Sequence, residues 1–297
     1  MEVIRDVREL QARADADRAA GLRLGLVPTM GALHAGHLAL VDAARERADR
    51  VCVSIFVNPA QFNAGADLAA YPRPLEADLA ACRERGVDRV FLPDAETLYG
   101  PGHQTWIEVS ELQKPLCGAS RPGHFRGVAT VVAKLLIAAK PHVAAFGEKD
   151  FQQLALVRRL VTDLGLDVEV LGVPTLRESD GLALSSRNLR LAPAARPQAL
   201  CLVRALDAAE AALAAGETRR DAVLAAVREE IGKAPLARLD YAELRDPDSL
   251  DDAPETLVAP TLLALAAFLP SRDGEGDVRL IDNRVLRAVP ASGRESS

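Results

Sequence analysis

Two histidines in one short segment are the residues of this chain whose spacing most clearly suggests chemistry. His34 and His37 are three residues apart, and Gly36 stands directly before the second of them. Imidazole N–H groups donate hydrogen bonds, and such bonds strengthen as negative charge builds up on a phosphate. Only 5 of the 297 residues are histidine, so this pair favours a phosphate site. The alternative is an exposed turn with two incidental histidines.

The same segment differs from the common phosphate-binding loop of nucleotide hydrolases. Gly31 and Gly36 have the spacing of the two glycines in G-x-x-x-x-G-K-[ST]. His37 and Leu38, however, stand where that motif has a lysine and a hydroxyl residue. A standard P-loop is therefore not expected.

The elements around the histidines predict how they are positioned. Leucines alternate over residues 22–26 as in a strand, and apolar residues recur at helical spacing over residues 38–48. The chain between them therefore predicts a strand, a glycine-bearing turn and a helix N-terminus. Backbone N–H groups and the positive end of the helix dipole would then point at one spot, which suits a phosphate.

Polar residues follow two further predicted strands. Asn58 and Gln61 come just after one alternating run, and Lys149 and Asp150 come just after a second, apolar run. Open α/β sheets place ligands at the carboxyl ends of their strands, and lysine is a good phosphate contact. The alternatives are a proline-terminated turn for the first pair, a solvated lysine, and a helix N-cap for Asp150.

A polar loop later in the chain gives a weaker signal. Ser185, Ser186 and Arg187 place two hydroxyls beside a guanidinium, a combination that can bind phosphate. By composition alone, an ordinary turn that leads into a helix is favoured for this loop.

The order of the predicted elements indicates two domains. In the first, residues 1–175, strands and helices alternate, which predicts an α/β fold with a Rossmann-like, doubly wound parallel sheet. It includes a polar helix over residues 2–20 and a strand over residues 105–109. In the second, residues 176–297, helices followed by strands predict a smaller α+β domain. Its helices are residues 193–215 and 218–231, and its strands are residues 237–244, 257–268 and 278–281.

Composition argues against several kinds of partner. The formal net charge is −6, so no global field attracts nucleic acid or an anionic membrane surface. The four cysteines are scattered without a C-x-x-C pair, which argues against a disulfide framework or a zinc site and favours the reducing cytoplasm. The first residues lack the apolar core of a signal peptide, and the apolar stretches are too short or too interrupted to span a bilayer.

Taken together, these segments resemble one family, the pantoate–β-alanine ligases (pantothenate synthetases). Residues 28–37 resemble the His-x-x-His nucleotide loop of that family. This turn alone would indicate only the wider superfamily of adenylyl-transferring enzymes, whereas the combination of segments is highly specific. The other matching segments occur in the family's order at residues 53–62, 71–73, 121–128, 146–154 and 177–188, and residues 241–246 and 279–283 extend the resemblance into the second domain.

The resemblance implies a two-step reaction in pantothenate and coenzyme A biosynthesis. The carboxylate of pantoate attacks the α-phosphorus of ATP and gives pantoyl adenylate and pyrophosphate. The amine of β-alanine then displaces AMP and forms pantothenate. The first step makes chemical sense because a carboxylate acylates poorly, whereas a mixed anhydride acylates well. Such ATP chemistry needs Mg²⁺, and the family leads us to expect a homodimer.

The resemblance also assigns residues to an ATP site and a pantoate site. Families of this kind are often described with the second histidine as a proton donor. We favour electrostatic stabilisation by His34 and His37, because a pyrophosphate leaving group hardly needs a proton. Lys149 suits phosphate, and Asp150 suits the ribose hydroxyls. The implied ATP-binding residues are Met30, Gly31, Ala32, Leu33, His34, Ala35, Gly36, His37, Gly147, Glu148, Lys149, Asp150, Leu176, Leu184, Ser185, Ser186 and Arg187. The implied pantoate-binding residues are Asn58, Gln61, Gln153 and Arg121, and the implied catalytic residues are His34, His37 and Lys149.

The metal site is where the sequence departs from the family. Ala77 stands where some members carry an aspartate, so Asp78 is the remaining candidate ligand for Mg²⁺. Much of the coordination would then come from phosphate oxygens and water. A second departure is a longer turn near Gly274.

Two other functions share parts of this pattern. A nucleotidylyltransferase would use a similar histidine loop but would keep AMP in a dinucleotide product. Gln61 and Gln153 argue against it, since two amides suit a small hydroxy acid better than a nucleotide phosphate. A non-catalytic ATP-binding regulatory protein would release neither AMP nor pyrophosphate from ATP and pantoate.

Overall fold

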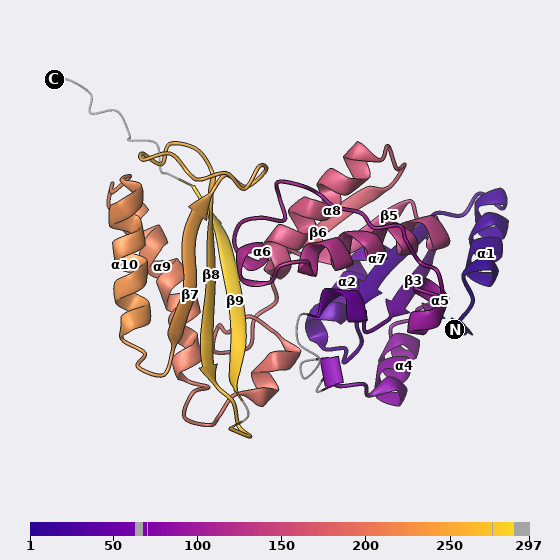
Figure 1. Cartoon of the computed structure of the whole chain (residues 1–297), viewed down its shortest axis with the longest axis horizontal. Helices are drawn as coiled ribbons and strands as arrows, with labels where there is room; N and C mark the ends of the chain where they lie inside the picture. Colours follow the sequence, from indigo (N-terminus) through magenta and orange to yellow (C-terminus); the bar gives the residue numbers. More distant parts are fainter. Residues whose placement is uncertain (63–67, 70, 275, 288–297) are drawn as a thin grey trace. The chain divides into compact units, whose positions relative to one another are not determined.

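The computed structural model of this protein describes residues 1–62, 68, 69, 71–274 and 276–287. By the contacts among its residues the chain divides into two compact units, Met1–Thr175 and Leu176–Ser297. Figure 1 colours the first unit from indigo to pink and the second from pink to yellow. Each unit has its own sheet and its own apolar core.

The first unit is built on a six-stranded sheet whose strand order is β1-β4-β3-β2-β5-β6. All the paired neighbours run parallel, which confirms the predicted doubly wound parallel sheet. The strands are β1 (Glu2–Ile4), β2 (Leu24–Thr29), β3 (Arg50–Ile55), β4 (Arg89–Phe91), β5 (Val143–Gly147) and β6 (Glu169–Val173).

Helices pack on both faces of this sheet because successive residues of a strand point to opposite sides. In β2, Leu26 packs in an apolar cluster with residues of α1, α7 and α8, whereas Val27 packs in a second cluster with residues of α2 and α4. Most of α7 is buried, as its apolar sequence predicts. The helices are α1 (Val7–Ala19), α2 (Ala35–Arg45), α4 (Leu75–Glu84), α5 (Ala95–Leu98), α6 (Cys117–Ser120), α7 (His124–Ala139) and α8 (Phe151–Asp163), with short 3₁₀ turns η1 (Pro59–Gln61) and η2 (Glu148–Asp150).

Two predicted elements of this unit are wrong. Residues 2–20 do not form one helix, because β1 pairs with β4 at the sheet edge before α1 begins, and the Asp6 carboxylate caps α1 by accepting the Glu9 N–H. Residues 105–109 are not a strand. There the Ile107 N–H donates to the hydroxyl of Thr130 on α7 at 3.0 Å, so the segment is attached to a helix side chain rather than to a sheet.

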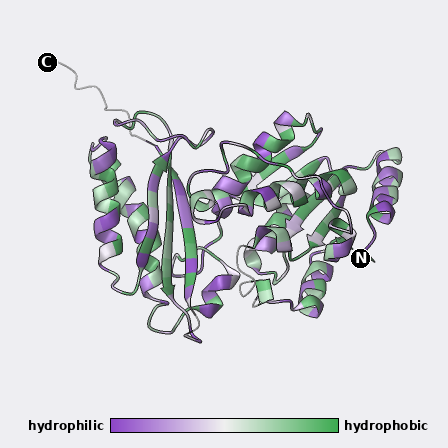
Figure 2. Cartoon of the chain, viewed as in Figure 1, coloured by the Kyte–Doolittle hydropathy of each residue, from purple (hydrophilic) through white to green (hydrophobic). Residues whose placement is uncertain are grey.

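The second unit packs two helices against a three-stranded antiparallel sheet of order β7-β8-β9. The middle strand is apolar along most of its length and is buried (Figure 2). The predicted α+β character is confirmed, but the first helix begins at Cys201 rather than near 193, after turns and a 3₁₀ turn. The elements are η3 (Ser186–Arg190), η4 (Gln198–Leu200), α9 (Cys201–Ala214), α10 (Arg220–Gly232), β7 (Arg238–Arg245), β8 (Thr261–Pro270) and β9 (Asp277–Leu286).

Candidate functional site

The polar segments of the first unit gather at one edge of its sheet. β2 lies between β3 and β5, and all three strands run parallel, so their carboxyl ends lie side by side. From β2 the chain continues to β3 on one side, and the later β5 lies on the other side. Open α/β sheets bind ligands at such a switch in strand order. The structure therefore brings together the loops that begin near residues 30, 58 and 147.

The loop after β2 is held in an unusual backbone conformation. Gly31 has φ +84° and Ala32 has φ +51°, both in the left-handed region. The Gly31 N–H donates to the hydroxyl of Thr29 at 3.2 Å, and that hydroxyl donates to the carbonyl of Ser54 on β3 at 2.7 Å. The loop is thereby tied to the ends of two neighbouring strands before α2 begins.

The two predicted catalytic histidines form the start of α2. Nδ1 of His34 accepts the Gly36 N–H at 3.1 Å, and Nδ1 of His37 accepts the His34 N–H at 3.3 Å. A ring nitrogen that accepts a hydrogen bond carries no proton, so each neutral imidazole carries its proton on Nε2. The ring centroids are 4.1 Å apart. The backbone thus fixes one tautomer for both rings and leaves Nε2–H as the donor of each.

Burial keeps both imidazoles neutral at pH 7. Burial lowers the pKa of His37 to about 3, with a smaller lowering by the neighbouring His34. The pKa of His34 is also lowered, mainly by burial and next by the positive charge of Lys149. Neutral imidazoles donate hydrogen bonds from Nε2–H but do not act as acids.

The backbone N–H groups of this loop are largely used within the protein. The sequence led us to expect them to face a phosphate, but they donate to acceptors within the loop and to the Asp78 carboxylate instead. Within the described residues, Nε2–H of His34 and Nε2–H of His37 donate to no protein acceptor, so these two groups can donate to a ligand at the predicted phosphate site. The N–H groups with an acceptor in the protein are those of Gly31, Ala32, Leu33, His34, Gly36, His37 and Leu38.

The end of β5 places charges beside the histidines. Gly147 is its last residue, and Glu148, Lys149 and Asp150 form η2. Lys149 lowers the pKa of both imidazoles and Asp150 raises it, so both charges act on the histidine pair. Asp150 stands at the N-cap position of α8, yet its side chain makes no capping hydrogen bond. Its exposed carboxylate is thus not used as a cap.

Gln61 is oriented by its neighbours after β3. Its Nε2 donates to the Met30 sulfur at 2.7 Å, and its Oε1 accepts from Asn58 Nδ2 at 3.2 Å. Asn58 is 1% exposed and also donates to the carbonyl of Gly127. Arg121 donates to the backbone carbonyl of Gln61 at 3.1 Å. The Gln61 amide therefore contacts the loop after β2 through Met30, while Asn58 holds that amide in place.

Two adjacent glutamines at the start of α8 differ in their surroundings. Gln152 is buried and clamps the chain before α6, since Nε2 donates to the carbonyls of Leu112 and Pro115 and Oε1 accepts the Cys117 N–H. Gln153 is half-buried, and within the part of the chain that the structure describes its amide makes no hydrogen bond. Of the two side chains, Gln153 is thus the one that can bind a substrate.

The remaining predicted site residues belong to the second unit. Leu184 and Leu176 lie on paired segments, since the Leu184 N–H donates to the Leu176 carbonyl at 2.9 Å. Ser185 is the N-cap of η3, where its hydroxyl accepts the Arg187 N–H at 3.3 Å. Ser185, Ser186 and Arg187 are half-buried and lie at the start of η3.

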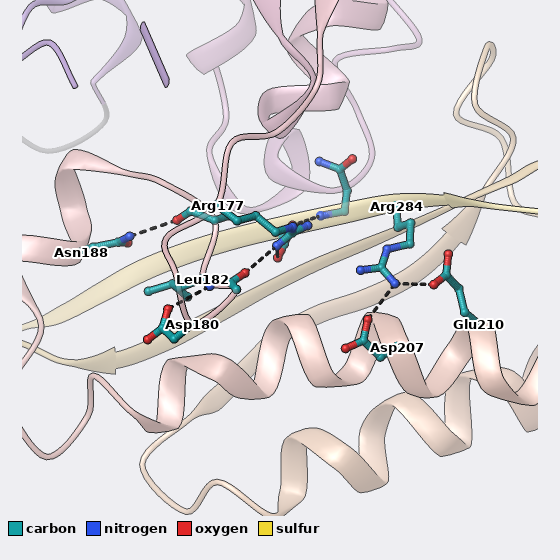
Figure 3. Close-up of polar contacts among 11 residues, drawn as sticks. Arg177, Asp180, Leu182, Asn188, Asp207, Glu210 and Arg284 are labelled. Atoms are coloured by element: carbon teal, nitrogen blue, oxygen red, sulfur yellow. Dashed lines mark hydrogen bonds and ion pairs between the residues drawn. The ribbon is translucent and has the colours of Figure 1, made fainter. Parts of the chain in front are cut away.

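A polar network that the sequence did not reveal supports this turn (Figure 3). Arg177 binds both carboxylate oxygens of Asp282 on β9, at 2.7 and 3.0 Å, and Asp282 is 2% exposed. Asn188 donates to Glu178 at 2.6 Å and to the Ala183 carbonyl at 3.0 Å. The sequence does carry a signal that Asp282 is buried. It lies at the same alternate positions of its strand as the buried Val278 and Leu280, so its side chain points to the same face of the sheet.

Asp78 is the carboxylate that the sequence predicts as a metal ligand. Among the described residues, no three His, Cys, Asp or Glu side chains are grouped so that they could hold a metal ion. Both oxygens of Asp78, the predicted ligand, accept backbone N–H groups. The described residues thus do not offer the set of oxygen ligands that a dedicated Mg²⁺ site would need. The assignment of Asp78 as a Mg²⁺ ligand stays a prediction. Separately, the helices of the described chain include none with the length and apolar character to cross a membrane.

Comparisons with known proteins match nearly the whole length of the chain. Residues 2–285 match the family model "Pantoate-beta-alanine ligase". The pantothenate synthetase of Syntrophobacter fumaroxidans is 52% identical over 287 residues, which cover 97% of this chain and 99% of the relative. The crystal structure of pantothenate synthetase from Thermus thermophilus has a TM-score of 0.88 at 44% identity, covering 97% of this chain and all of that one. The pantoate–β-alanine ligase of Francisella tularensis, complexed with β-γ ATP and β-alanine, has a TM-score of 0.77 at 32% identity, covering 96% and 97%.

Proposed function

Because this chain belongs to the pantoate–β-alanine ligase family, we propose that it condenses pantoate with β-alanine through a pantoyl-adenylate intermediate and releases AMP and pyrophosphate. The observation that carries the proposal is the pair of imidazoles at the start of α2, both neutral and both presenting Nε2–H. Fixed N–H donors of this kind suit a transition state in which negative charge moves onto a phosphate.

In the first step a carboxylate oxygen of pantoate attacks the α-phosphorus of ATP. The bond from that phosphorus to the bridging oxygen breaks, and the electron pair leaves with pyrophosphate. We propose that Nε2–H of His34 and of His37 donate to the phosphate oxygens that gain charge, together with the Lys149 ammonium. No proton is transferred, because a neutral imidazole with a lowered pKa has none to give as an acid.

In the second step the β-alanine amine attacks the acyl carbon of the adenylate. The carbon–oxygen bond to AMP breaks, the amide forms, and the ammonium intermediate loses a proton. For pantoate, we assign the amides of Gln61 and Gln153, each of which can donate to a carboxylate or accept from a hydroxyl. Asn58 acts through Gln61, which it contacts. Arg121 supports the same residue through its backbone carbonyl.

The other residues of the ATP site follow by position in the family motifs. We propose that the loop from Met30 to His37 and the η2 turn contact the nucleotide in the first unit, with Asp150 at the ribose hydroxyls. Leu176 and Leu184, with the Ser185–Arg187 turn, are proposed ATP contacts of the second unit. ATP is expected to arrive as its Mg²⁺ complex, with phosphate oxygens and water as the main metal ligands. A homodimer and a cytoplasmic location remain predictions.

The test is to identify the products by mass spectrometry after incubation with ATP, Mg²⁺ and pantoate, with and without β-alanine. We expect pyrophosphate in both samples, and pantothenate with AMP only when β-alanine is present. Pyrophosphate that appears only with β-alanine would contradict a stepwise adenylate mechanism. A dinucleotide product would indicate a nucleotidylyltransferase, and the absence of turnover would indicate a regulatory ATP-binding protein.

A further inference from the structure

Asp78 is a buried carboxylate on α4 that contacts the loop between β2 and α2. It lies in the first turn of α4 and is 3% exposed. Its Oδ2 accepts the Ala32 N–H at 2.9 Å, and its Oδ1 accepts the Leu33 N–H at 2.7 Å. Hydrogen bonds from N–H groups to an ionised carboxylate are among the stronger ones in proteins.

The backbone that Asp78 binds needs such support. Ala32 is not a glycine, yet its φ is +51°, a conformation that its Cβ makes unfavourable. Successive N–H groups in a turn of this kind form a concave site for an anion. Here the anion is the protein's own carboxylate. The fit is close, since a Cβ on Gly31 would lie 2.9 Å from Oδ2 of Asp78.

The surroundings of Asp78 are poor in further metal ligands. It borders a cavity of about 400 Å³ whose walls are largely apolar and include Ile55, Leu75 and Leu92. The other carboxylate at this cavity, Asp94, accepts both the N–H and the hydroxyl of Thr97 at 2.7 Å. Mg²⁺ prefers an octahedron of oxygen ligands, which these groups do not supply.

We propose that Asp78 is a positioning residue for adenylate formation, which holds the loop after β2 so that His34 and His37 present Nε2–H to the ATP phosphates. The carboxylate fixes residues 32 and 33, and the next residue is the histidine that caps α2. The catalytic part of this role rests on the proposed function. The contact itself is independent of that function and can be measured separately.

The experiment compares the wild-type protein with Asp78→Asn and Glu76→Gln. The asparagine keeps the shape but replaces one acceptor oxygen by an NH₂ group, which would face a backbone N–H. Glu76 is an exposed carboxylate two residues away on the same helix, and its variant is the matched control. Amide exchange at residues 32 and 33 is followed by NMR. Pyrophosphate release from ATP and pantoate is followed over a series of Mg²⁺ concentrations.

In the wild type we expect amides 32 and 33 to be protected without ATP or Mg²⁺. In Asp78→Asn we expect at least one of them to exchange about tenfold faster or more, with the amides of β3 and β5 unchanged. Pyrophosphate release should fall about ten- to hundredfold, as for the loss of a hydrogen bond to a charged group, and added Mg²⁺ should not restore it. Glu76→Gln should match the wild type.

Several results would overturn the proposal. Wild-type exchange and wild-type rates in a folded Asp78→Asn would show that the contact does not matter. Recovery of the rate at high Mg²⁺ would make Asp78 a metal ligand instead. Should Asp78→Asn fail to fold, unprotected amides 32 and 33 in the wild type would by themselves refute it. If the wild type releases no pyrophosphate, the proposed function fails, and the exchange data still decide whether Asp78 holds the loop.

Discussion

At the scale of single residues, the chemistry depends on which nitrogen of each imidazole carries the proton. The backbone of the loop leaves no choice here, since both Nδ1 atoms are occupied by N–H donors. Each ring can therefore act on a ligand only through Nε2–H. Burial and the nearby Lys149 keep the rings neutral. Neutral rings that present Nε2–H support the proposed role of both histidines as hydrogen-bond donors to phosphate.

His37→Ala should slow pyrophosphate release from ATP and pantoate by about a hundredfold or more, since it removes one donor to the transition state. ATP affinity should fall less, because Lys149 and the other imidazole remain. Chemically supplied pantoyl adenylate should react with β-alanine at close to the wild-type rate, since that step expels no pyrophosphate. Rapid-quench assays of the two half-reactions measure both effects.

The control for this variant is His103→Ala, which removes an imidazole outside the site and should leave both half-reactions unchanged. Equal losses of His37→Ala in both steps would argue against the assignment. They would mean either that the fold is damaged, which circular dichroism would reveal, or that the imidazole also acts on the amine.

The buried imidazole of His37 also makes stability depend on pH. Its pKa is about 3 in the folded protein and 6.5 when unperturbed, so the unfolded chain binds the proton first as the pH falls. The stabilisation is fully present above pH 6.5 and is lost as the pH decreases toward 3. When the pH falls from 7.5 to 5, the free energy of unfolding should decrease by about 2 kcal/mol because of this residue. Urea unfolding should show that loss in the wild type, and a clearly smaller one in His37→Gln.

At the scale of elements, one close contact between α7 and η1 positions the Gln61 amide, which is proposed to bind pantoate. A Cβ on Gly127 of α7 would lie 2.3 Å from the Ala60 carbonyl oxygen and 2.8 Å from the Gln61 nitrogen. Only a residue without a side chain lets the helix approach this near. This close approach also lets the Asn58 side chain donate hydrogen bonds to both the Gly127 carbonyl and the Gln61 side chain.

Gly127→Ala should therefore separate the two elements and displace Gln61. We expect the free energy of unfolding to fall by about 1–3 kcal/mol, as in other overpacked sites, and pantoate to bind more weakly. Calorimetric titration with pantoate and thermal unfolding test both effects. Gly232→Ala at the end of α10 is the control, since a Cβ there meets no atom within 4 Å. A Gly127→Ala protein with unchanged stability would contradict the argument.

In the second unit, a buried ion pair anchors the turn that carries Ser185 and Arg187. The side chains of Arg177 and Asp282 are 25% and 1% exposed. Arg177→Met would leave the buried Asp282 carboxylate without its positively charged partner, with the Asn283 N–H still donating to it, and should lower the free energy of unfolding by about 3–5 kcal/mol. Hydrogen exchange should locate the loss in residues 177–188.

Arg284 offers a matched control, because it lies on β9, the strand that carries Asp282 (Figure 3). Arg284 pairs with Asp207 and Glu210, whose side chains are 61% and 52% exposed. Because water can solvate these two carboxylates, Arg284→Met should cost only about 0–1 kcal/mol. Similar losses for the two arginine variants would show that burial of the carboxylate does not set the cost.

At the scale of the whole molecule, an acidic chain has to bind acidic substrates. The net charge of −6 provides no long-range attraction for ATP or pantoate. Capture must come from local groups, and the first unit supplies imidazole N–H, an ammonium and side-chain amides at one sheet edge. The second unit has its own core and its own turn with Ser185 and Arg187. Each unit thus carries proposed ATP-binding groups on a separately stabilised scaffold.

Local sequence determined much of this. Alternating leucines before the histidines and helical spacing after them were enough to place His34 and His37 between a strand and a helix, because both periods are properties of neighbouring residues. The same holds for the alternation of strands and helices that predicted the parallel sheet. β1 was missed because it is only 3 residues long, too short for a period to show.

Only the tertiary structure decided what supports these residues. Asp78 meets the loop 45 residues before it, and Arg177 meets Asp282 105 residues after it. Gln152 and Gln153 are adjacent and identical in type, yet one is a buried clamp and the other is available to a substrate. Such partners are chosen by packing in three dimensions, so no local pattern records them. The sequence determined which groups could do the chemistry. The folded backbone determined that Nε2 of each imidazole is the nitrogen left for a ligand, and that the Asp78 carboxylate binds the loop just before them.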